Sequence, residues 1–292
     1  MPTAEEYRKF LVQGASIGGE YVFVMQHGIA DGGLGVKLGR RVGSSLEFME
    51  HRDYQPGDDL RNLDWNVYAR TEHLTVKMYR EEINPRLDLI LDGSASMALP
   101  GSGKAEALLT LASLLAVCAG NSGFLTRVWL SREQLMPVRN GGGAPMDWDG
   151  VVFDGIAPLS VTLNEFTGTF QHRGIRILLT DLLWDAPPET VLRKLREEAA
   201  ELVVIQILGR ADLDPGWNGN IRLVDVESGE HDELFLDATA LEKYRLTLAT
   251  HQQNWERACR EAGARLLLIT AEEFLEKFDL QSLLAAELIR HV

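Results

Sequence analysis

The chain has 292 residues, and its 45% hydrophobic and 25% charged residues are the proportions of an ordinary globular protein, which excludes a disordered chain. Its formal net charge of -14 argues against a partner bound through a phosphate backbone, because such a partner requires a basic surface. The two cysteines, Cys118 and Cys259, belong to no Cys/His cluster, so neither a zinc site nor a disulfide framework is indicated.

The amino-terminal residues and the longest apolar run together indicate a cytoplasmic protein. Residues 1–14 carry early acids and lack the apolar core of a signal peptide. The longest apolar run, residues 107–119, is shorter than the ~20 residues that span a bilayer. We therefore expect a soluble, cytoplasmic protein without a membrane span.

Residues 1–86 predict a smaller, β-rich amino-terminal segment. Residues 3–13 have the spacing of a short helix, and residues 21–25 have the composition of a strand. Residues 27–43 are rich in glycine and show no helical period, which predicts an extended loop whose role stays open. Residues 74–79 alternate between apolar and polar, as a half-buried strand does.

From Leu87 onwards, predicted strands alternate with predicted helices. This alternation favours an α/β fold with a mostly parallel, doubly wound sheet, so we expect a second domain over residues 87–292. The predicted strands cover residues 87–92, 125–130, 135–138, 175–181, 202–208 and 265–269, with short edge strands at 221–226 and 233–236. The predicted helices cover residues 104–120, 163–172, 188–198 and 239–262, with the final helices inside 271–289.

The first of these strands ends abruptly in polar residues. Asp92 closes the apolar run, and Ser94 and Ser96 follow it at alternate positions. Ligands of open α/β sheets bind at the carboxyl ends of the strands, where these three side chains stand. One carboxylate and two hydroxyls in a tight loop can converge on a hard cation. The alternative is a polar turn in which these side chains only satisfy backbone groups.

A second predicted strand also ends on an acid, Asp181. If the two strands are neighbours, Asp92 and Asp181 lie close together, and a divalent cation would relieve their repulsion. A third hydroxyl is expected from the loop before the predicted helix at residues 163–172. Thr162 is the first candidate, although its spacing from Glu165 also fits a helix cap, and Ser160 is the alternative.

The segment before the first strand carries a charged and aromatic signature, RxYxPGDDxRxxDW, in a locally neutral stretch. Its side chains form either a surface for a partner or an internal network of ion pairs. Its residues are Arg52, Tyr54, Asp58, Asp59, Arg61, Asp64, Trp65 and Arg70. The signature together with Asp92-x-Ser94-x-Ser96 resembles the domain-of-unknown-function family fifty-eight. The DxSxS pattern alone is similar to the metal-ion-dependent adhesion site of von Willebrand factor A domains.

This resemblance implies a von Willebrand A-like fold and a function in metal-dependent protein binding. A divalent cation would be held by Ser94, Ser96 and a threonine, with Asp92 and Asp181 acting directly or through water. Mg²⁺ is favoured, with Mn²⁺ and Ca²⁺ left open. The open coordination position would take an acidic side chain of a partner, and the family's usual associate is a MoxR-type AAA+ ATPase. The chain would then be its adaptor or co-chaperone.

Two other classes of function stay open, and both are disfavoured by the residues. A metal-dependent phosphoester hydrolase could use Asp92 as its nucleophile, but the position two residues later is Ser94 rather than a second acid. Gly101–Lys104 is no phosphate-binding loop, because Ala98 and Ala105 stand where that motif needs Gly and Ser/Thr. The other class is a structural domain with a vestigial site. We therefore expect a binding protein and not an enzyme.

Overall fold

The computed structural model describes residues 4–24, 46–81, 85–227 and 229–292, and it divides into two compact units. The larger unit comprises residues 1–26 and 85–292, and the smaller comprises residues 27–84. The expected division into 1–86 and 87–292 therefore assigned the first helix and strand to the wrong unit.

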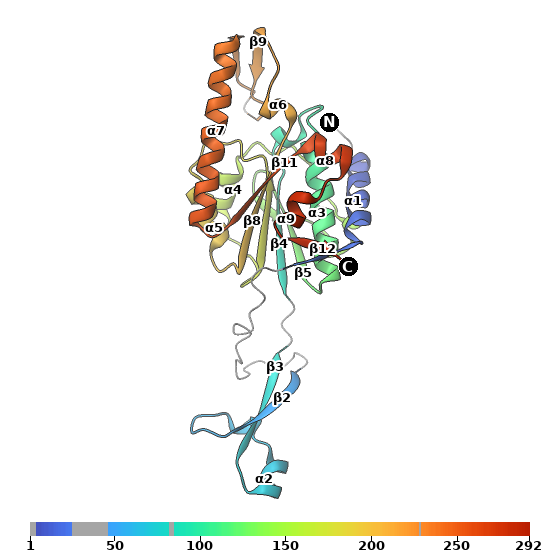
Figure 1. Ribbon diagram of the computed structural model, residues 1–292, viewed down its shortest axis with the longest axis vertical. Coiled ribbons are helices and arrows are strands. Elements are labelled where there is room, and N and C mark those ends of the chain that lie inside the picture. The colour runs from blue at the N-terminus through green and yellow to red at the C-terminus, as the bar shows by residue number, and fades with distance from the viewer. Residues whose placement is uncertain (1–3, 25–45, 82–84, 228) are drawn as a thin grey trace. The chain divides into compact units, whose positions relative to one another are not determined.

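The core of the larger unit is a six-stranded, mostly parallel sheet in a mixed α/β arrangement (Figure 1). Its strand order is β11-β8-β7-β4-β5-β6, and only β6 is antiparallel to its neighbour. The order reverses between β4 and β7, so the carboxyl ends of these two strands are adjacent. The strands are β4 (Arg86–Asp92), β5 (Leu125–Ser131), β6 (Leu135–Pro137), β7 (Ile175–Thr180), β8 (Glu201–Leu208) and β11 (Arg265–Thr270).

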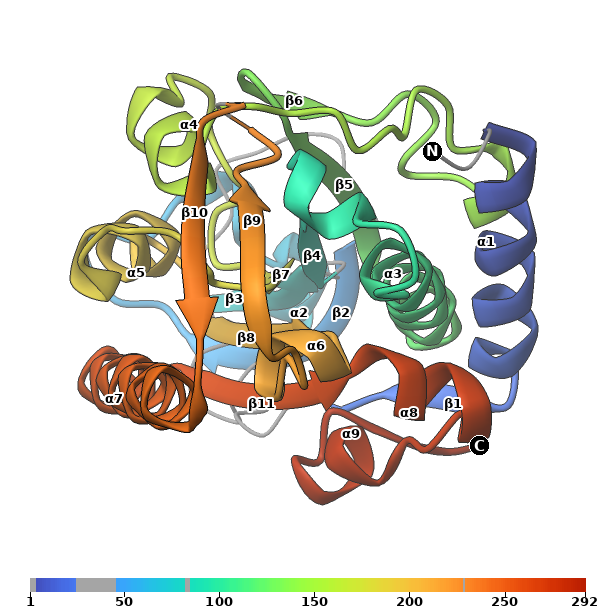
Figure 2. The same cartoon turned by 90° about the horizontal axis from the view of Figure 1, so that it is seen from above.

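Helices lie on both faces of this sheet, as the view from above makes clear (Figure 2). On one face are α1 (Ala4–Gly18), α3 (Lys104–Asn121), α8 (Ala271–Lys277) and α9 (Gln281–Ala285); on the other are α4 (Leu159–Glu165), α5 (Pro188–Arg196) and α7 (Ala238–Glu261). Successive residues of β4 point to opposite faces, so Leu89 joins the cluster around α3 and Ile90 joins the cluster that contains Trp255 of α7.

Helix α3 is apolar enough and long enough to cross a membrane, judged by length and composition alone. In the fold, 72% of that segment is buried, and it forms the centre of one hydrophobic cluster. The apolar composition of α3 is therefore explained by its burial against the sheet.

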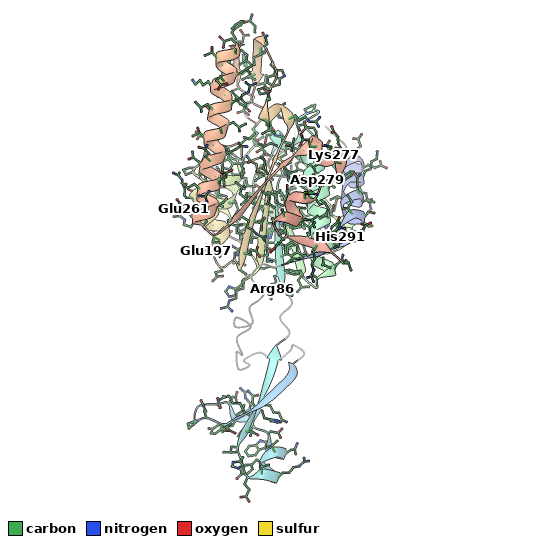
Figure 3. All side chains as sticks on the ribbon, in the orientation of Figure 1. Arg86, Glu197, Glu261, Lys277, Asp279 and His291 are labelled. Carbon is green, nitrogen blue, oxygen red and sulfur yellow. The ribbon has the colours of Figure 1, made fainter. Side chains whose placement is uncertain are left out.

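The first helix joins the larger unit because glycines let it approach α3 closely. A Cβ atom on Gly14 would lie 2.0 Å from the carbonyl oxygen of Thr110, so a larger residue does not fit there. The following strand β1 (Tyr21–Phe23) pairs with β12 (Ile289–His291) at the other end of the chain; His291 is labelled in Figure 3. This packing explains why residues 4–24 do not belong to the β-rich segment.

Two further expectations are corrected by the structure. The helix expected over residues 163–172 is instead α4, which starts four residues earlier and ends at Glu165; beyond it Phe166 and Phe170 pack edge-on against Trp129. The expected edge strands do not join the main sheet. They form a separate antiparallel ribbon of β9 (Gly219–Val224) and β10 (His231–Leu236), which follows the short helix α6 (Arg210–Leu213).

The smaller unit is built on an antiparallel pair, β2 (Leu46–Asp53) and β3 (Thr75–Glu81), with a bulge between Phe48 and Glu50. Between the strands lie the 3-10 turn η1 (Leu60–Asn62) and helix α2 (Trp65–Thr71). Residues 55–58 form a turn in which the N–H of Asp58 donates to the carbonyl of Gln55 at 3.0 Å, and Gly57 at its third position has a φ of 108°. The glycine-rich stretch at 27–43 lies entirely outside the described residues.

A candidate metal centre at the carboxyl edge of the sheet

Asp92 is the last residue of β4, and its carboxylate is buried with 2% of its surface exposed. Its Oδ1 accepts a hydrogen bond of 3.0 Å from the peptide N–H of Ser94. Its Oδ2 accepts one of 2.6 Å from the hydroxyl of Thr180, the last residue of β7. The chain then turns into η2 (Ala95–Ala98), where the hydroxyls of Ser94 and Ser96 lie 3.0 Å apart. The three predicted side chains of this loop thus lie together.

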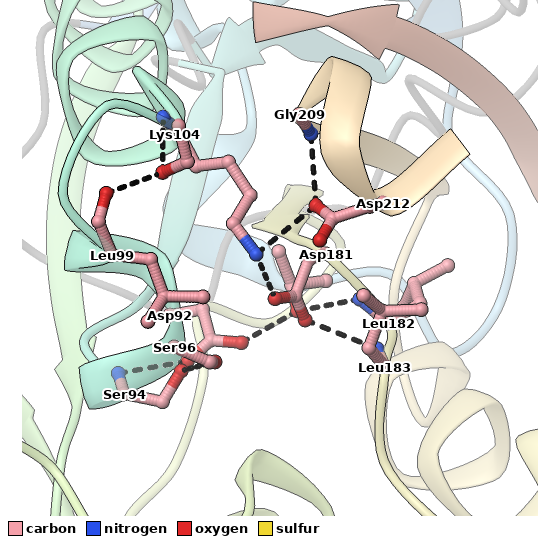
Figure 4. A network of polar contacts seen from close by, with 12 residues as sticks. Asp92, Ser94, Ser96, Leu99, Lys104, Asp181, Leu182, Leu183, Gly209 and Asp212 are labelled. Carbon is pink, nitrogen blue, oxygen red and sulfur yellow. Dashed lines mark hydrogen bonds and ion pairs between the residues drawn. The ribbon is translucent and has the colours of Figure 1, made fainter. Parts of the chain in front are cut away.

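Asp181 directly follows β7, the strand that pairs in parallel with β4. Its Oδ1 accepts a hydrogen bond of 3.0 Å from the peptide N–H of Leu183. Its Oδ2 lies 2.9 Å from the ammonium group of Lys104 (Figure 4). The same ammonium lies 3.2 Å from a carboxylate oxygen of Asp212 on α6, which also accepts a hydrogen bond from the peptide N–H of Gly209. Lys104 therefore bridges two acids.

The electrostatics of the site follow from this burial. Desolvation, and after it the neighbouring charge of Asp181, raise the pKa of Asp92 to about 6. The hydrogen bonds that Asp92 accepts favour its ionised form and oppose this rise. Burial alone would lower the pKa of Lys104, but Asp181 and Asp212 beside it outweigh burial, and the net direction is upward. The site thus holds a charged lysine and carboxylates whose repulsion an added cation would reduce.

Thr162, the predicted third hydroxyl, is not a helix cap. Helix α4 begins at Leu159 with Pro158 before it, so Thr162 lies inside the helix. Its hydroxyl lies 2.5 Å from that of Ser131 and donates a hydrogen bond of 3.1 Å to the carbonyl of Leu159. Neither partner is a predicted ligand. Ser160, the alternative, is buried in the first turn of the same helix.

The residues present form an oxygen donor set that fits a hard divalent cation. Asp92, Ser94 and Ser96 lie together, and Asp181 follows the adjacent strand β7. Among the described residues no group of three or more His, Cys, Asp or Glu side chains has the arrangement of a metal site. A cation at this edge would therefore depend on serine hydroxyls and water as well as carboxylates, a shell that suits Mg²⁺.

The signature of the smaller unit is largely an internal polar network. Arg52 donates to both carboxylate oxygens of Asp58, at 2.8 and 2.9 Å, and Asp58 also accepts the peptide N–H of Gln55. Asp59 caps η1 and pairs with Arg61 at 2.7 Å.

Asp64 has the most partners in this network. It caps α2 through the peptide N–H groups of Asn66 and Val67, and it lies 2.9 Å from His51 and 3.4 Å from Lys77. The His51 contact, the two peptide groups and Lys77 hold the pKa of Asp64 at about 2. Its role in ordering the segment is therefore structural.

Three signature residues remain outside these ion pairs. Trp65 is 61% exposed and meets Tyr68 edge-on, and Arg70 is also exposed on α2. Tyr54 is half-buried, and its peptide N–H pairs with the carbonyl of Leu74. A partner surface on this unit would have to use exposed side chains such as Trp65 and Arg70.

Lys104 and Asp212 are the residues of the site that sequence reasoning missed. Lys104 was considered only within a rejected phosphate-binding motif. A signal was present, because a lysine in the first turn of a buried, apolar helix is opposed by the helix dipole and requires an acidic partner. Nothing in the sequence around Asp212, on a four-residue helix, indicated that it would be that partner.

One family matches most of the chain. The family described as protein of unknown function DUF58 matches residues 50–256. Uncharacterized proteins of Mycobacterium bovis and Mycobacterium tuberculosis are each 29% identical over 256 residues, covering 82% of this chain and 78% of the relative.

Two solved structures from Bacteroides are also similar. An aerotolerance-related membrane protein of Bacteroides fragilis has a TM-score of 0.33 at 11% identity, over 69% of this chain and 99% of its own. The conserved hypothetical protein BatB of Bacteroides thetaiotaomicron has a TM-score of 0.34 at 10% identity, over 70% and 98%. The sequence match over residues 50–256 identifies the chain as a member of the DUF58 family.

Proposed function

We propose that this protein is a metal-dependent protein-binding module of von Willebrand A type, with no catalytic activity of its own. The observation that carries the proposal is the position of Asp92, Ser94, Ser96 and Asp181 at the carboxyl ends of two adjacent parallel strands. The strand order, which reverses at these strands, and the helices on both faces of the sheet support a doubly wound architecture.

In this proposal a divalent cation, Mg²⁺ by preference, links the chain to its partner. Asp92, Ser94 and Ser96 hold the cation, and Asp181 contacts it directly or through water because one of its oxygens already pairs with Lys104. An acidic side chain of the partner completes the coordination. The expected partner is a MoxR-type AAA+ ATPase, for which the chain would serve as adaptor or co-chaperone in the cytoplasm.

One observation favours a second candidate, a structural domain with a vestigial site. The ammonium of Lys104 already balances part of the charge at Asp181, and the hydroxyl of Thr162 is directed to Ser131. In that case the buried polar groups would only stabilise the carboxyl edge of the sheet. The two candidates differ in one measurable property, the affinity of the site for a divalent cation.

Calorimetric titration of the full chain with MgCl₂ and MnCl₂ tests the proposal. Saturable binding that Asp92→Ala removes supports it, whereas the absence of binding leaves the vestigial domain as the better account. Asp185→Ala, on the exposed acid just beyond the Asp181 loop, is the matched control and is expected to bind as the wild type does.

The partner is tested separately. Capture of a MoxR-type ATPase by immobilised chain is expected in Mg²⁺ and not in EDTA. Capture that is indifferent to EDTA would contradict the mechanism even if metal binds. Turnover of a phosphoester by the pure protein, lost in Asp92→Asn, would instead establish the hydrolase alternative.

A further inference from the structure

Asp181 is held at several points beside the candidate metal loop. Its carbonyl accepts a hydrogen bond of 3.0 Å from the buried side-chain amide of Gln206 on β8. One oxygen of its carboxylate accepts the peptide N–H of Leu183, and the ammonium of Lys104 lies 2.9 Å from the other oxygen (Figure 4). The residue before Asp181 donates a hydrogen bond of 2.6 Å to Asp92. Asp181 is therefore fixed next to the loop, and both of its carboxylate oxygens already have a partner.

The ammonium of Lys104 has two carboxylates as partners and is shielded from water. Its side chain is 1% exposed, and the ammonium lies 2.9 Å from Asp181 and 3.2 Å from Asp212. Lys104 is also the first residue of α3, where the helix dipole opposes a positive charge. A buried ion pair is often no more stabilising than well-packed apolar side chains of similar volume. The position of this lysine therefore calls for a role besides stability.

The charges around the loop leave a balance that one divalent cation would neutralise. Asp92, Asp181 and Asp212 each carry a negative charge when ionised, and Lys104 offsets one of the three. A cation at the Asp92 loop and the ammonium of Lys104 would both interact with the carboxylate of Asp181. Because Lys104 offsets one acid, the centre with a divalent cation bound is neutral rather than negative. A neutral centre can accept the acidic side chain of a partner without repelling it.

We infer that Lys104 is an internal cation of this centre, which competes with the divalent cation for Asp181. This inference rests on the proposed function, and it decides how Asp181 takes part: while Lys104 holds one of its oxygens, Asp181 reaches the bound cation through water. Lys104 is then a positioning residue that lowers the affinity of the centre for the cation. Asp212 limits this competition, because it takes part of the interaction of the ammonium away from Asp181.

Mn²⁺ binding to the full chain, measured by calorimetry, tests this inference with two variants. Lys104→Met keeps the length of the side chain and removes its charge, so the affinity is expected to rise about tenfold. Asp212→Asn leaves the ammonium with Asp181 alone, so the affinity is expected to fall by a similar factor. Asp214→Asn, on the acid directly after α6 that pairs with Arg245 at 3.0 Å, is the matched control and is expected to leave the affinity unchanged.

The opposite signs of the two effects separate competition from a structural role. If Lys104 only maintains the shape of the site, both substitutions lower the affinity or leave it unchanged, and the inference is overturned. Should Lys104→Met not fold, the double variant Lys104→Met/Asp212→Asn replaces it, because it leaves one buried acid fewer without a counter-ion. Its affinity is then expected to exceed that of Asp212→Asn, and an equal or lower affinity overturns the inference.

Water proton relaxation gives a second readout, which a structural role would not change. In Lys104→Met the oxygen of Asp181 that Lys104 held is free to enter the shell of the bound Mn²⁺. The variant is therefore expected to have fewer exchangeable waters on Mn²⁺ than the wild type. An unchanged number of waters would contradict the water-mediated position of Asp181.

Failure of the proposed function gives a different pattern of results. If the wild type binds Mn²⁺ through Asp92 and Lys104→Met binds no more tightly, competition is ruled out and the proposed metal centre stands. If only Lys104→Met binds Mn²⁺, and adding Asp92→Ala removes that binding, Lys104 is the internal cation and the native site is vestigial. If neither protein binds Mn²⁺, both proposals are overturned.

Discussion

The ammonium of Lys104 lies 2.9 Å from a carboxylate oxygen of Asp181, and both side chains are almost completely buried. Lys104 begins α3 on one side of the sheet, and Asp181 follows the central strand β7. The same ammonium reaches Asp212 of α6 at 3.2 Å. The Lys104 ammonium, which belongs to the helix that covers the core, therefore contacts both Asp181 beside the candidate metal loop and Asp212 at the base of the β9–β10 ribbon.

Removing the positive charge of Lys104 is expected to destabilise the protein strongly. In Lys104→Met the side chain keeps its length, but Asp181 and Asp212 lose their counter-ion, and removing one partner of a buried pair costs about 3–5 kcal/mol. Urea unfolding in EDTA measures the loss. The double variant Lys104→Met/Asp181→Asn is expected to be more stable than the sum of the two single effects, because the unpaired charge is gone. Strict additivity would show that the two residues do not interact.

The stability of the metal-free protein is expected to depend on Asp92 through pH. The pKa of Asp92 is raised to about 6, above the value of about 3.9 in an unfolded chain, so the folded state binds the proton more tightly. Stability associated with the protonated carboxyl is fully present below pH ~4 and is lost as pH rises through about 6. Asp92→Asn lacks this loss and is expected to be more stable at pH 7, by at most ~3 kcal/mol.

Urea unfolding in EDTA at pH 4 and pH 7 checks this expectation. The difference between Asp92→Asn and the wild type should be small at the lower pH and should grow toward the higher one. Parallel stability profiles for the two proteins would contradict the burial and repulsion assigned to Asp92. Addition of Mg²⁺ should then raise the melting temperature of the wild type but not of Asp92→Asn.

The smaller unit is expected to lose stability in acid, because the pKa of Asp64 is lowered whereas that of Asp92 is raised. The pKa of Asp64 is lowered to about 2 by His51, the peptide groups of α2 and Lys77. Its contribution is therefore present above the unfolded value near ~3.9 and is lost as pH falls toward about 2. Amide chemical shifts of α2 in a pH titration report this loss. Asp64→Ala should remove the dependence, and Asp53→Asn, on an exposed acid, should retain it.

The close contact between α1 and α3 predicts a strong effect of a small substitution. A methyl group at Gly14 would lie 2.0 Å from the carbonyl of Thr110 and 2.1 Å from the hydroxyl of Ser113. Gly14→Ala is therefore expected to cost about 3 kcal/mol in urea unfolding, since the helices must separate. Gly120→Ala, within α3 where the added methyl group meets nothing within 4 Å, is expected to be neutral or to stabilise by up to ~1 kcal/mol. Equal effects of the two substitutions would contradict this packing.

Much of the larger unit follows from patterns within short stretches of sequence. The apolar runs that end at Asp92 and Thr180 predict buried strands, and the structure contains both as neighbours in a parallel sheet. Hydrophobic burial and the period of a strand are local properties, so they can be recognised without the fold. Because parallel strands bring their carboxyl ends to one edge, the proximity of Asp92 and Asp181 was predictable as well.

Contacts between residues far apart in the chain could not be predicted in this way. The sequence did not indicate that Lys104 would pair with Asp181 and Asp212. Nor did the sequence indicate that the hydroxyl of Thr162 would lie 2.5 Å from that of Ser131, whose Cα pairs with that of Asp92 across β4 and β5. These outcomes depend on how helices and a ribbon pack around the sheet edge, because a buried charge takes whichever opposite charge the packing brings within reach.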